Sequence, residues 1–175
     1  MKPPYKLTRQ LAAACAMATL ACASWAAPST APAECGLIGS WSGYETGDLY
    51  WLGTHSPGTY PTSGTMQMDW TYVSPSLLSG AARLTNGRGV WELVRKGQYR
   101  YTWYAYGLDA SGGTFYTVRV SGLAQNTDCN NVQIGYKYEI FYPPVEPALM
   151  SSAVPVDVKT GTAYEKRLLQ APATP

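Results

Sequence analysis

Residues 132–142 of this chain alternate apolar and polar side chains at almost every position, and residues 65–73 do the same. Successive side chains of a β-strand point to opposite faces of a sheet, so a period of two predicts strands with one buried face. Almost no helical periodicity occurs between residues 36 and 142. A chain with this pattern builds its core between sheet faces, which indicates an all-β fold.

Segments with strand patterns are separated by clusters of Gly, Asn, Asp, Ser and Pro, which are typical of turns. The segment 77–84 has a weak strand pattern, and 162–169 is also compatible with a short helix. Sequential antiparallel strands with one apolar face predict a single up-and-down β-barrel of about eight strands, with a sandwich as the alternative. The expected strands cover residues 38–45, 65–73, 77–84, 89–94, 98–108, 114–123, 132–142 and 162–169.

Two longer connections are expected within the barrel domain. Residues 53–64 are rich in Gly, Pro, Ser and Thr and predict a long loop. Residues 143–161 carry four prolines and predict a second loop before a closing strand. The barrel domain is therefore expected to span residues 36–169, after a flexible leader at 27–35 and before a tail at 170–175.

Residues 1–26 are typical of a secretory signal peptide. Lys2, Lys6 and Arg9 precede an apolar run, and small residues follow at the positions of a cleavage site. No segment is long and apolar enough for a membrane span. We therefore expect a secreted or periplasmic protein. The sequence TLAC loosely matches a bacterial lipobox, so a lipid anchor at Cys22 in the cell envelope is the alternative.

The charge of the chain depends on this signal peptide. The full sequence has 13 Lys and Arg against 11 Asp and Glu, a net charge of +2. Cleavage removes three cations and no anion, which leaves 10 against 11, or −1. No cationic cluster remains that would suit a nucleic acid or an anionic membrane, so we expect neither as a partner.

Cys35 and Cys129 are the two cysteines that remain after cleavage. A lone pair of cysteines in an oxidising compartment most simply forms one disulfide. Such a bond would close a long loop and stabilise the fold by up to about 4–5 kcal/mol. Two free thiols are the alternative.

The segment 89–108 predicts a hairpin for which two registers are possible. A two-residue turn at Lys96–Gly97 would place Glu92 on the aromatic face. A three-residue loop, 95–97, with Gly97 left-handed, separates the two faces better and is preferred. In this second register the facing pairs are Leu93 with Tyr99, Trp91 with Tyr101, Gly89 with Trp103, Glu92 with Arg100 and Val94 with Gln98.

The inner face of the expected barrel is unusually rich in amphipathic rings. Leu93, Val132, Ile134 and Ile140 are the aliphatic residues expected on the same inner face. Buried hydroxyl and indole N–H groups need partners, so this composition suits a partly wet cavity that binds a flat or chain-like apolar ligand. A barrel packed only with its own side chains is the alternative. The candidate ligand-binding residues are Met66, Met68, Trp70, Tyr72, Trp91, Tyr99, Tyr101, Trp103, Tyr136 and Tyr138.

The sequence GSW at 39–41 resembles the G-x-W signature of the lipocalins and the wider calycin superfamily. In that family the Trp closes one end of the barrel against a basic residue of the last strand. The resemblance therefore implies this structural role for Trp41, with Arg167 or Lys166 as its partner. It implies a calycin-type barrel but no particular ligand.

A second likeness covers residues 36–142 and 160–168. GVWE at 89–92, the following YRYTW, the turn at 109–113 and VSG at 120–122 together resemble uncharacterised bacterial lipocalin-like proteins. Arg88 stands where a His often precedes GVWE in those proteins. No role of that His is therefore transferred to this chain.

The chain shows no motif for catalysis or for metal binding. His55 is the only histidine and is expected to lie in a loop without function. By alternation Asp69, Glu92 and Glu139 are expected to face solvent, which disfavours a paired-carboxylate hydrolase. We expect no cofactor and no metal, and an enzyme is less expected than a binding protein.

The function that these features favour is binding of a small apolar or amphiphilic ligand inside the barrel. A packed barrel that serves as a non-catalytic envelope or extracellular interaction module is the alternative. Outward rings such as Tyr104 and Tyr106 would then form its contact surface. A barrel enzyme of the cyclase or isomerase type is a third possibility, and no residue in the sequence singles out its catalytic group.

Overall fold

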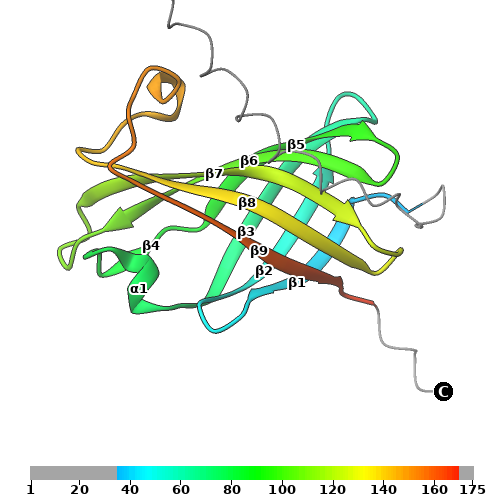
Figure 1. Cartoon of the computed structure of the whole chain (residues 1–175), viewed down its shortest axis with the longest axis horizontal. Helices are drawn as coiled ribbons and strands as arrows, with labels where there is room; N and C mark the ends of the chain where they lie inside the picture. The colour runs from blue at the N-terminus through cyan, green and yellow to red at the C-terminus, as the bar shows by residue number, and fades with distance from the viewer. Residues whose placement is uncertain (1–34, 170–175) are drawn as a thin grey trace, which may run out of the picture.

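The computed structural model describes residues 35–169. The expected signal peptide, the lipobox cysteine, the leader up to residue 34 and the tail from residue 170 lie outside the described residues. The described part is a closed, all-antiparallel β-barrel of eight strands with one additional short strand (Figure 1). The predicted fold class is confirmed.

The strands follow one another around the barrel in chain order (Figure 1). Pairing of β6 with β7, and of β1 with β9, closes the sheet on itself and leaves no long free edge. The short strand β4 pairs with the end of β6. The elements are β1 (Gly39–Glu45), β2 (Leu49–Pro57), β3 (Ser63–Val73), α1 (Pro75–Leu78), β4 (Arg83–Leu84), β5 (Gly87–Arg95), β6 (Gln98–Leu108), β7 (Thr114–Asn126), β8 (Asn131–Phe141), the 3-10 helix η1 (Pro147–Leu149) and β9 (Asp157–Arg167).

Two differences from the predicted strands offset each other. Strand β2 ends at Pro57 and so occupies the first five residues of the expected loop 53–64. The sequence hides this strand because Tyr50 and Leu52 are apolar but point outward, whereas Gly53 points inward. The expected strand 77–84 instead contains part of helix α1 and the two-residue β4. The number of barrel strands is therefore as expected, but their assignment in this part of the chain was wrong.

The hairpin of β5 and β6 has the preferred register. Trp91 faces Tyr101, and Glu92 faces Arg100, to which it is ion-paired at 2.8 Å. The turn itself differs: Arg95, not Val94, lies opposite Gln98, and a bulge separates this pair from the rest of the ladder. Gly97 has the expected positive φ, 70°.

Tyr72 lies on the outer face of the barrel, so its assignment to the interior was wrong. The ladder pairs Trp51 with Trp70 but Tyr50 with Tyr72, so the shift between them reverses the side to which Tyr72 points. Tyr72 extends a row of tyrosines across β9, β1, β2 and β3. Neighbouring ring centroids in this tyrosine ladder are 5.6, 6.4 and 6.1 Å apart, in the order Tyr164, Tyr44, Tyr50, Tyr72.

One end of the barrel is closed by Trp41 and Arg167. The guanidinium carbon of Arg167 lies 4.2 Å from the centre of the Trp41 ring, and the indole N–H of Trp41 donates to Leu37 O at 2.8 Å. Arg167 also donates hydrogen bonds to the carbonyls of Gly36, Ile38 and Cys129. The contact implied by the G-x-W resemblance is thus present, and Arg167 is the basic residue that makes it.

The disulfide between Cys35 and Cys129 is present and joins residues 94 positions apart. It ties the start of the described chain to the turn between β7 and β8 at the same closed end. Tyr99 donates to Cys35 O at 3.3 Å and so anchors this segment from inside the barrel.

Leu93 was expected inside the barrel. Its side chain is instead 37% exposed beside the β5–β6 turn.

Glu139 is buried, and the expectation that it faces solvent was wrong. It does point to the outer face, but the proline-rich connection between β8 and β9 folds over it. Its carboxylate is ion-paired with Arg119 at 2.7 Å and with Lys137 at 2.6 Å. Arg119 in turn donates to Met150 O of the connection at 3.3 Å.

Strand β9 begins at Asp157, which lies within the range 143–161 that was expected to be a loop.

Replacing Arg167 with Gln should lower the free energy of unfolding by about 1–3 kcal/mol, because a cation–π contact and charged hydrogen bonds are lost. Urea unfolding followed by Trp fluorescence measures this change. Arg100→Gln is the matched control: it breaks an exposed ion pair with Glu92 and should cost less than about 1 kcal/mol. Equal losses in the two variants would contradict a special role for the Trp41 contact.

Candidate functional site

The barrel encloses a cavity of about 60 Å³ between the closed end and helix α1. Its walls are almost entirely apolar. Every barrel strand contributes at least one buried side chain to the interior. Residues that line it include Leu49, Trp51, Met66, Met68, Trp70, Tyr101, Trp103, Ile134, Tyr136, Tyr138 and Ala163. The interior is therefore largely filled by its own side chains, with space left for a few small groups.

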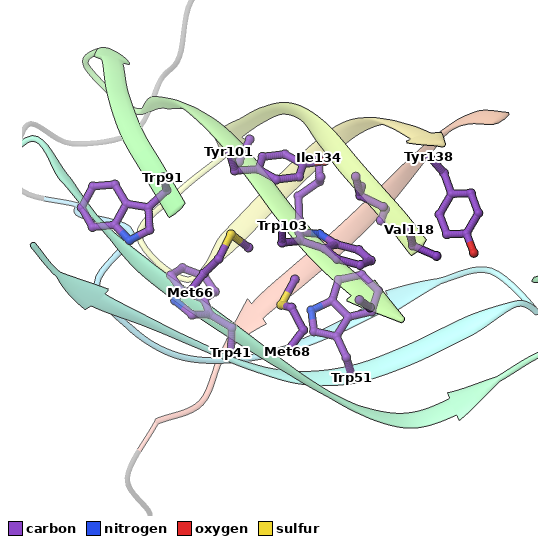
Figure 2. Close-up of a cluster of buried hydrophobic side chains, with 14 of the residues drawn as sticks. Trp41, Trp51, Met66, Met68, Trp91, Tyr101, Trp103, Val118, Ile134 and Tyr138 are labelled. Carbon is purple, nitrogen blue, oxygen red and sulfur yellow. The ribbon is translucent and has the colours of Figure 1, made fainter. Parts of the chain in front are cut away.

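Three tryptophans form a continuous aromatic wall of this cavity. The ring centroids of Trp51 and Trp70 are 6.5 Å apart, and those of Trp70 and Trp103 are 5.1 Å apart. Met66 and Met68 precede Trp70 on β3, and their thioethers fill the space between the rings (Figure 2). Such a wall favours flat or chain-like apolar groups.

The base of the cavity holds a buried carboxylate and the single histidine. Glu165 accepts a hydrogen bond from the indole N–H of Trp51 at 2.8 Å. Its other oxygen lies 3.3 Å from Nε2 of His55. The side chains of His55 and Glu165 are only 3% and 1% exposed. His55 Nδ1 has no hydrogen-bond partner among the described residues.

Gly43 makes this arrangement possible. It lies opposite both Trp51 and Glu165 in the sheet. A Cβ atom at position 43 would come within 2.0–2.4 Å of the Trp51 indole, a distance that real contacts do not allow. The missing side chain lets the indole lie across β1 and reach the carboxylate on β9.

A second polar pair lies at the other end of the cavity. The hydroxyl of Tyr136 donates to the carboxylate of Glu45. Burial of the phenol, together with the nearby Glu45 charge, raises the pKa of Tyr136 well above its usual value. This tyrosine therefore stays protonated and acts as a donor at neutral pH.

Helix α1 and its flanking residues lie at one end of the barrel, away from the end at which β9 finishes (Figure 1). Hydroxyls from the barrel hold this segment: Tyr116 donates to Leu78 O at 2.6 Å, and Tyr138 donates to Leu77 O at 3.2 Å. Lys159 donates to Ser76 O at 3.4 Å. No residue of the four-residue helix is itself buried, but its flanks are anchored: Ser74 and Ser76 donate to Asp48, and Ala81 is part of the core.

The candidate residues from the sequence fall into three groups. Trp91 and Tyr99 are buried, but they pack against each other near the closed end, with ring centroids 5.8 Å apart, and do not line the cavity. Tyr72 is outside. The residues that do line it are Met66, Met68, Trp70, Tyr101, Trp103, Tyr136 and Tyr138.

The sequence interpretation missed the polar base of the cavity. His55 was expected in a loop, yet β2 carries it inward, and Glu165 was not singled out. A signal for Glu165 did exist: if Arg167 contacts Trp41, the period of two places Glu165 and Ala163 on the inner face as well. His55 follows in the same way once β2 is recognised, because it shares a face with Trp51 and Gly53.

Within residues 35–169, no group of three or more His, Cys, Asp and Glu side chains is placed to hold a metal ion. No helix in this range is long and apolar enough to cross a membrane. The chemistry that the site itself supplies is apolar contact, hydrogen bonding and one buried carboxylate–imidazole pair.

The buried tyrosines predict a loss of stability at alkaline pH. Burial raises the pKa of Tyr116 to about 12, whereas unfolded tyrosines ionise near pH 10. The folded state then binds more protons than the unfolded state, so the free energy of unfolding should fall as pH rises from about 10 to 12. Tyr116 alone should contribute roughly 2–3 kcal/mol to this fall.

Denaturant unfolding at pH 9–12 measures this dependence. Tyr116→Phe should flatten the pH profile, although it also loses the hydrogen bond to Leu78. Tyr60→Phe, at a position 70% exposed, is the control and should leave the profile unchanged. A wild-type profile that stays level up to pH 12 would show that the buried phenols ionise normally.

No protein-family model matches the chain, and no curated protein matches its sequence.

Proposed function

We propose that this protein is a secreted or periplasmic, lipocalin-like barrel that binds a small apolar or amphiphilic ligand in its interior. The observation that carries the proposal is the cavity itself, whose aromatic walls separate two polar ends. A site of this kind orients a ligand with few polar contacts and binds it through apolar area. No catalytic step is needed for this role.

The polar groups of the interior support ligand binding over simple filling. A barrel that only needs a core is filled adequately by Leu, Ile, Val and Phe. Burial of Glu165 costs free energy unless the carboxylate is well paired. Among the described residues, the side chains that contact it are the imidazole of His55 at 3.3 Å and the indole of Trp51. The burial of Glu165 is therefore unfavourable for stability, and its carboxylate lies where a ligand in the cavity would contact it.

The size of the cavity sets a condition on the ligand. At about 60 Å³ it is smaller than the roughly 300 Å³ at which typical ligand sites begin. A ligand of more than a few non-hydrogen atoms therefore requires the segment around α1 to move. Helix α1 itself has no buried residue, which favours such a movement. Displacement of this segment would open the end of the barrel.

The closed end supports the lipocalin-like part of the proposal. The stacking of Arg167 on Trp41 is the contact that the G-x-W resemblance implies. The disulfide between Cys35 and Cys129 supports an oxidising location outside the cytoplasm. Soluble and lipid-anchored forms are both compatible with this location.

A packed barrel that acts as an interaction module is the second candidate. The small cavity favours it, and so does the tyrosine ladder, whose members are 41–47% exposed on the outer face. This ladder, rather than the half-buried Tyr104 and Tyr106, would form the contact surface.

Binding of the neutral fluorescent probe N-phenyl-1-naphthylamine tests the proposal. We expect saturable binding with quenching of Trp emission, because the probe would lie against the tryptophan wall. Ala163 lines the cavity, and Ala163→Met should fill it and weaken binding by about tenfold or more, the effect of losing roughly 1.4 kcal/mol. Ala110→Met, in the exposed turn after β6, is the matched control and should bind as the wild type does.

Binding that is unaffected by Ala163→Met would place the probe on the outer surface. The absence of saturable binding by this probe and by a panel of lipids and aromatic compounds would favour the packed barrel instead.

A further inference from the structure

Resting on the proposed ligand-binding function, we propose that the ligand is an organic cation. It would be a protonated amine with an apolar body, whose ammonium group binds at the base of the cavity beside Glu165 and His55. The balance of charges, donors and acceptors inside the barrel supports this assignment.

The charges inside the barrel favour a cation. Glu165 is the deeply buried carboxylate of the cavity, and no Lys or Arg of the described residues forms an ion pair with it. Lys159, the only Lys or Arg among the lining residues, has a side chain that is 41% exposed. It interacts with Ser76 O and, at 3.9 Å, with Asp157. Glu45 adds a second carboxylate.

Most hydrogen-bond donors of the lining already have protein acceptors. The indole N–H of Trp103 is the exception, since it makes no hydrogen bond within residues 35–169. The paired donors are Trp51 with Glu165, Trp70 with Thr85 O at 2.7 Å, Tyr101 with Gly135 O at 3.3 Å, Tyr136 with Glu45, and Tyr138 with Leu77 O. A ligand that needs donors from the protein would find few.

Acceptors remain unused at the base of the cavity. A carboxylate offers about four acceptor positions, and two contacts to Glu165 are present. If Nε2 of His55 carries the proton that faces this carboxylate, Nδ1 is a lone-pair acceptor. That atom is buried without a partner among the described residues. An ammonium group, which has three donors and no acceptor, matches this set.

The walls of the cavity also suit a cation with an apolar body. An ammonium group is attracted to the faces of Trp and Tyr rings within about 6 Å. Trp51, which is hydrogen-bonded to Glu165, also begins the tryptophan wall. A cation at the base would therefore meet a carboxylate and aromatic rings together, while its hydrocarbon part lies along Trp70 and Trp103.

The test compares three ligands of one shape and different charge: hexylammonium, hexan-1-ol and hexanoate. Titration calorimetry at neutral pH, supported by displacement of N-phenyl-1-naphthylamine, measures their affinities for the full secreted chain. We expect hexylammonium to bind about tenfold or more tightly than hexan-1-ol, as a charge-assisted hydrogen bond allows. Hexanoate should bind most weakly.

Two variants test whether the preference for hexylammonium depends on Glu165. Glu165→Gln keeps the shape of the side chain and removes its charge, so the preference for hexylammonium over hexan-1-ol should disappear. Glu139→Gln is the matched control: it removes a carboxylate that is equally buried but lies on the outer face, and the preference should persist. Circular dichroism and the thermal midpoint of each variant establish that it is folded. If Glu165→Gln does not fold, the wild-type ranking of the three ligands still decides.

The outcomes separate this inference from the function on which it rests. If hexan-1-ol or hexanoate binds as tightly as hexylammonium, the interior is a ligand site but not a cation site, and the inference is wrong. If hexylammonium binds most tightly to the wild type, but the folded Glu165→Gln variant keeps this preference, the cation binds elsewhere and the inference is equally wrong. If none of the three ligands nor the neutral probe binds, both proposals fail.

Discussion

The pairing of β1 with β9 is the interaction on which the rest of the structure depends. It joins the first strand to the last, so the open sheet becomes a barrel with an interior. The same register places Trp41 opposite Arg167 and Gly43 opposite Glu165. One pair of strands therefore both closes the end of the barrel and delivers the buried carboxylate to the cavity. A slip by one residue would turn Glu165 and Arg167 to the outside.

Close contact between large rings and glycines on neighbouring strands gives the interior its shape. Trp51 lies across Gly43, and Tyr136 lies in the same way across Gly161, where a Cβ would come within 2.3 Å of the phenol oxygen. In both cases the ring reaches a carboxylate beyond the glycine: Glu165 for Trp51 and Glu45 for Tyr136. The aromatic residues of the barrel thus do two things, since they fill space and also orient the acids at the two ends.

The fold could be predicted from the sequence because strands β3, β6, β7 and β8 alternate clearly, and because the register of the β5–β6 hairpin follows from separating its two faces. What could not be predicted were positions where the alternation is locally broken. The bulge in β3 turns Tyr72 outward, and the outward apolar side chains of β2 hide that strand. Glu139 follows the alternation, but its burial depends on a distant connection that folds over the outer face. Such tertiary coverage leaves no trace in local periodicity.

The buried pair of Glu165 and His55 at the base of the barrel is informative about function. Replacing a buried ion pair with well-packed apolar side chains is often neutral or stabilising, so stability alone does not explain why a carboxylate and an imidazole stand at this place. Trp51 and His55 satisfy only part of the hydrogen-bonding capacity of Glu165. A partly satisfied polar group in an apolar interior is costly unless something else completes it. The aromatic wall that begins at Trp51 and the acceptors left open beside it point to the same completing group, a cation with an apolar body.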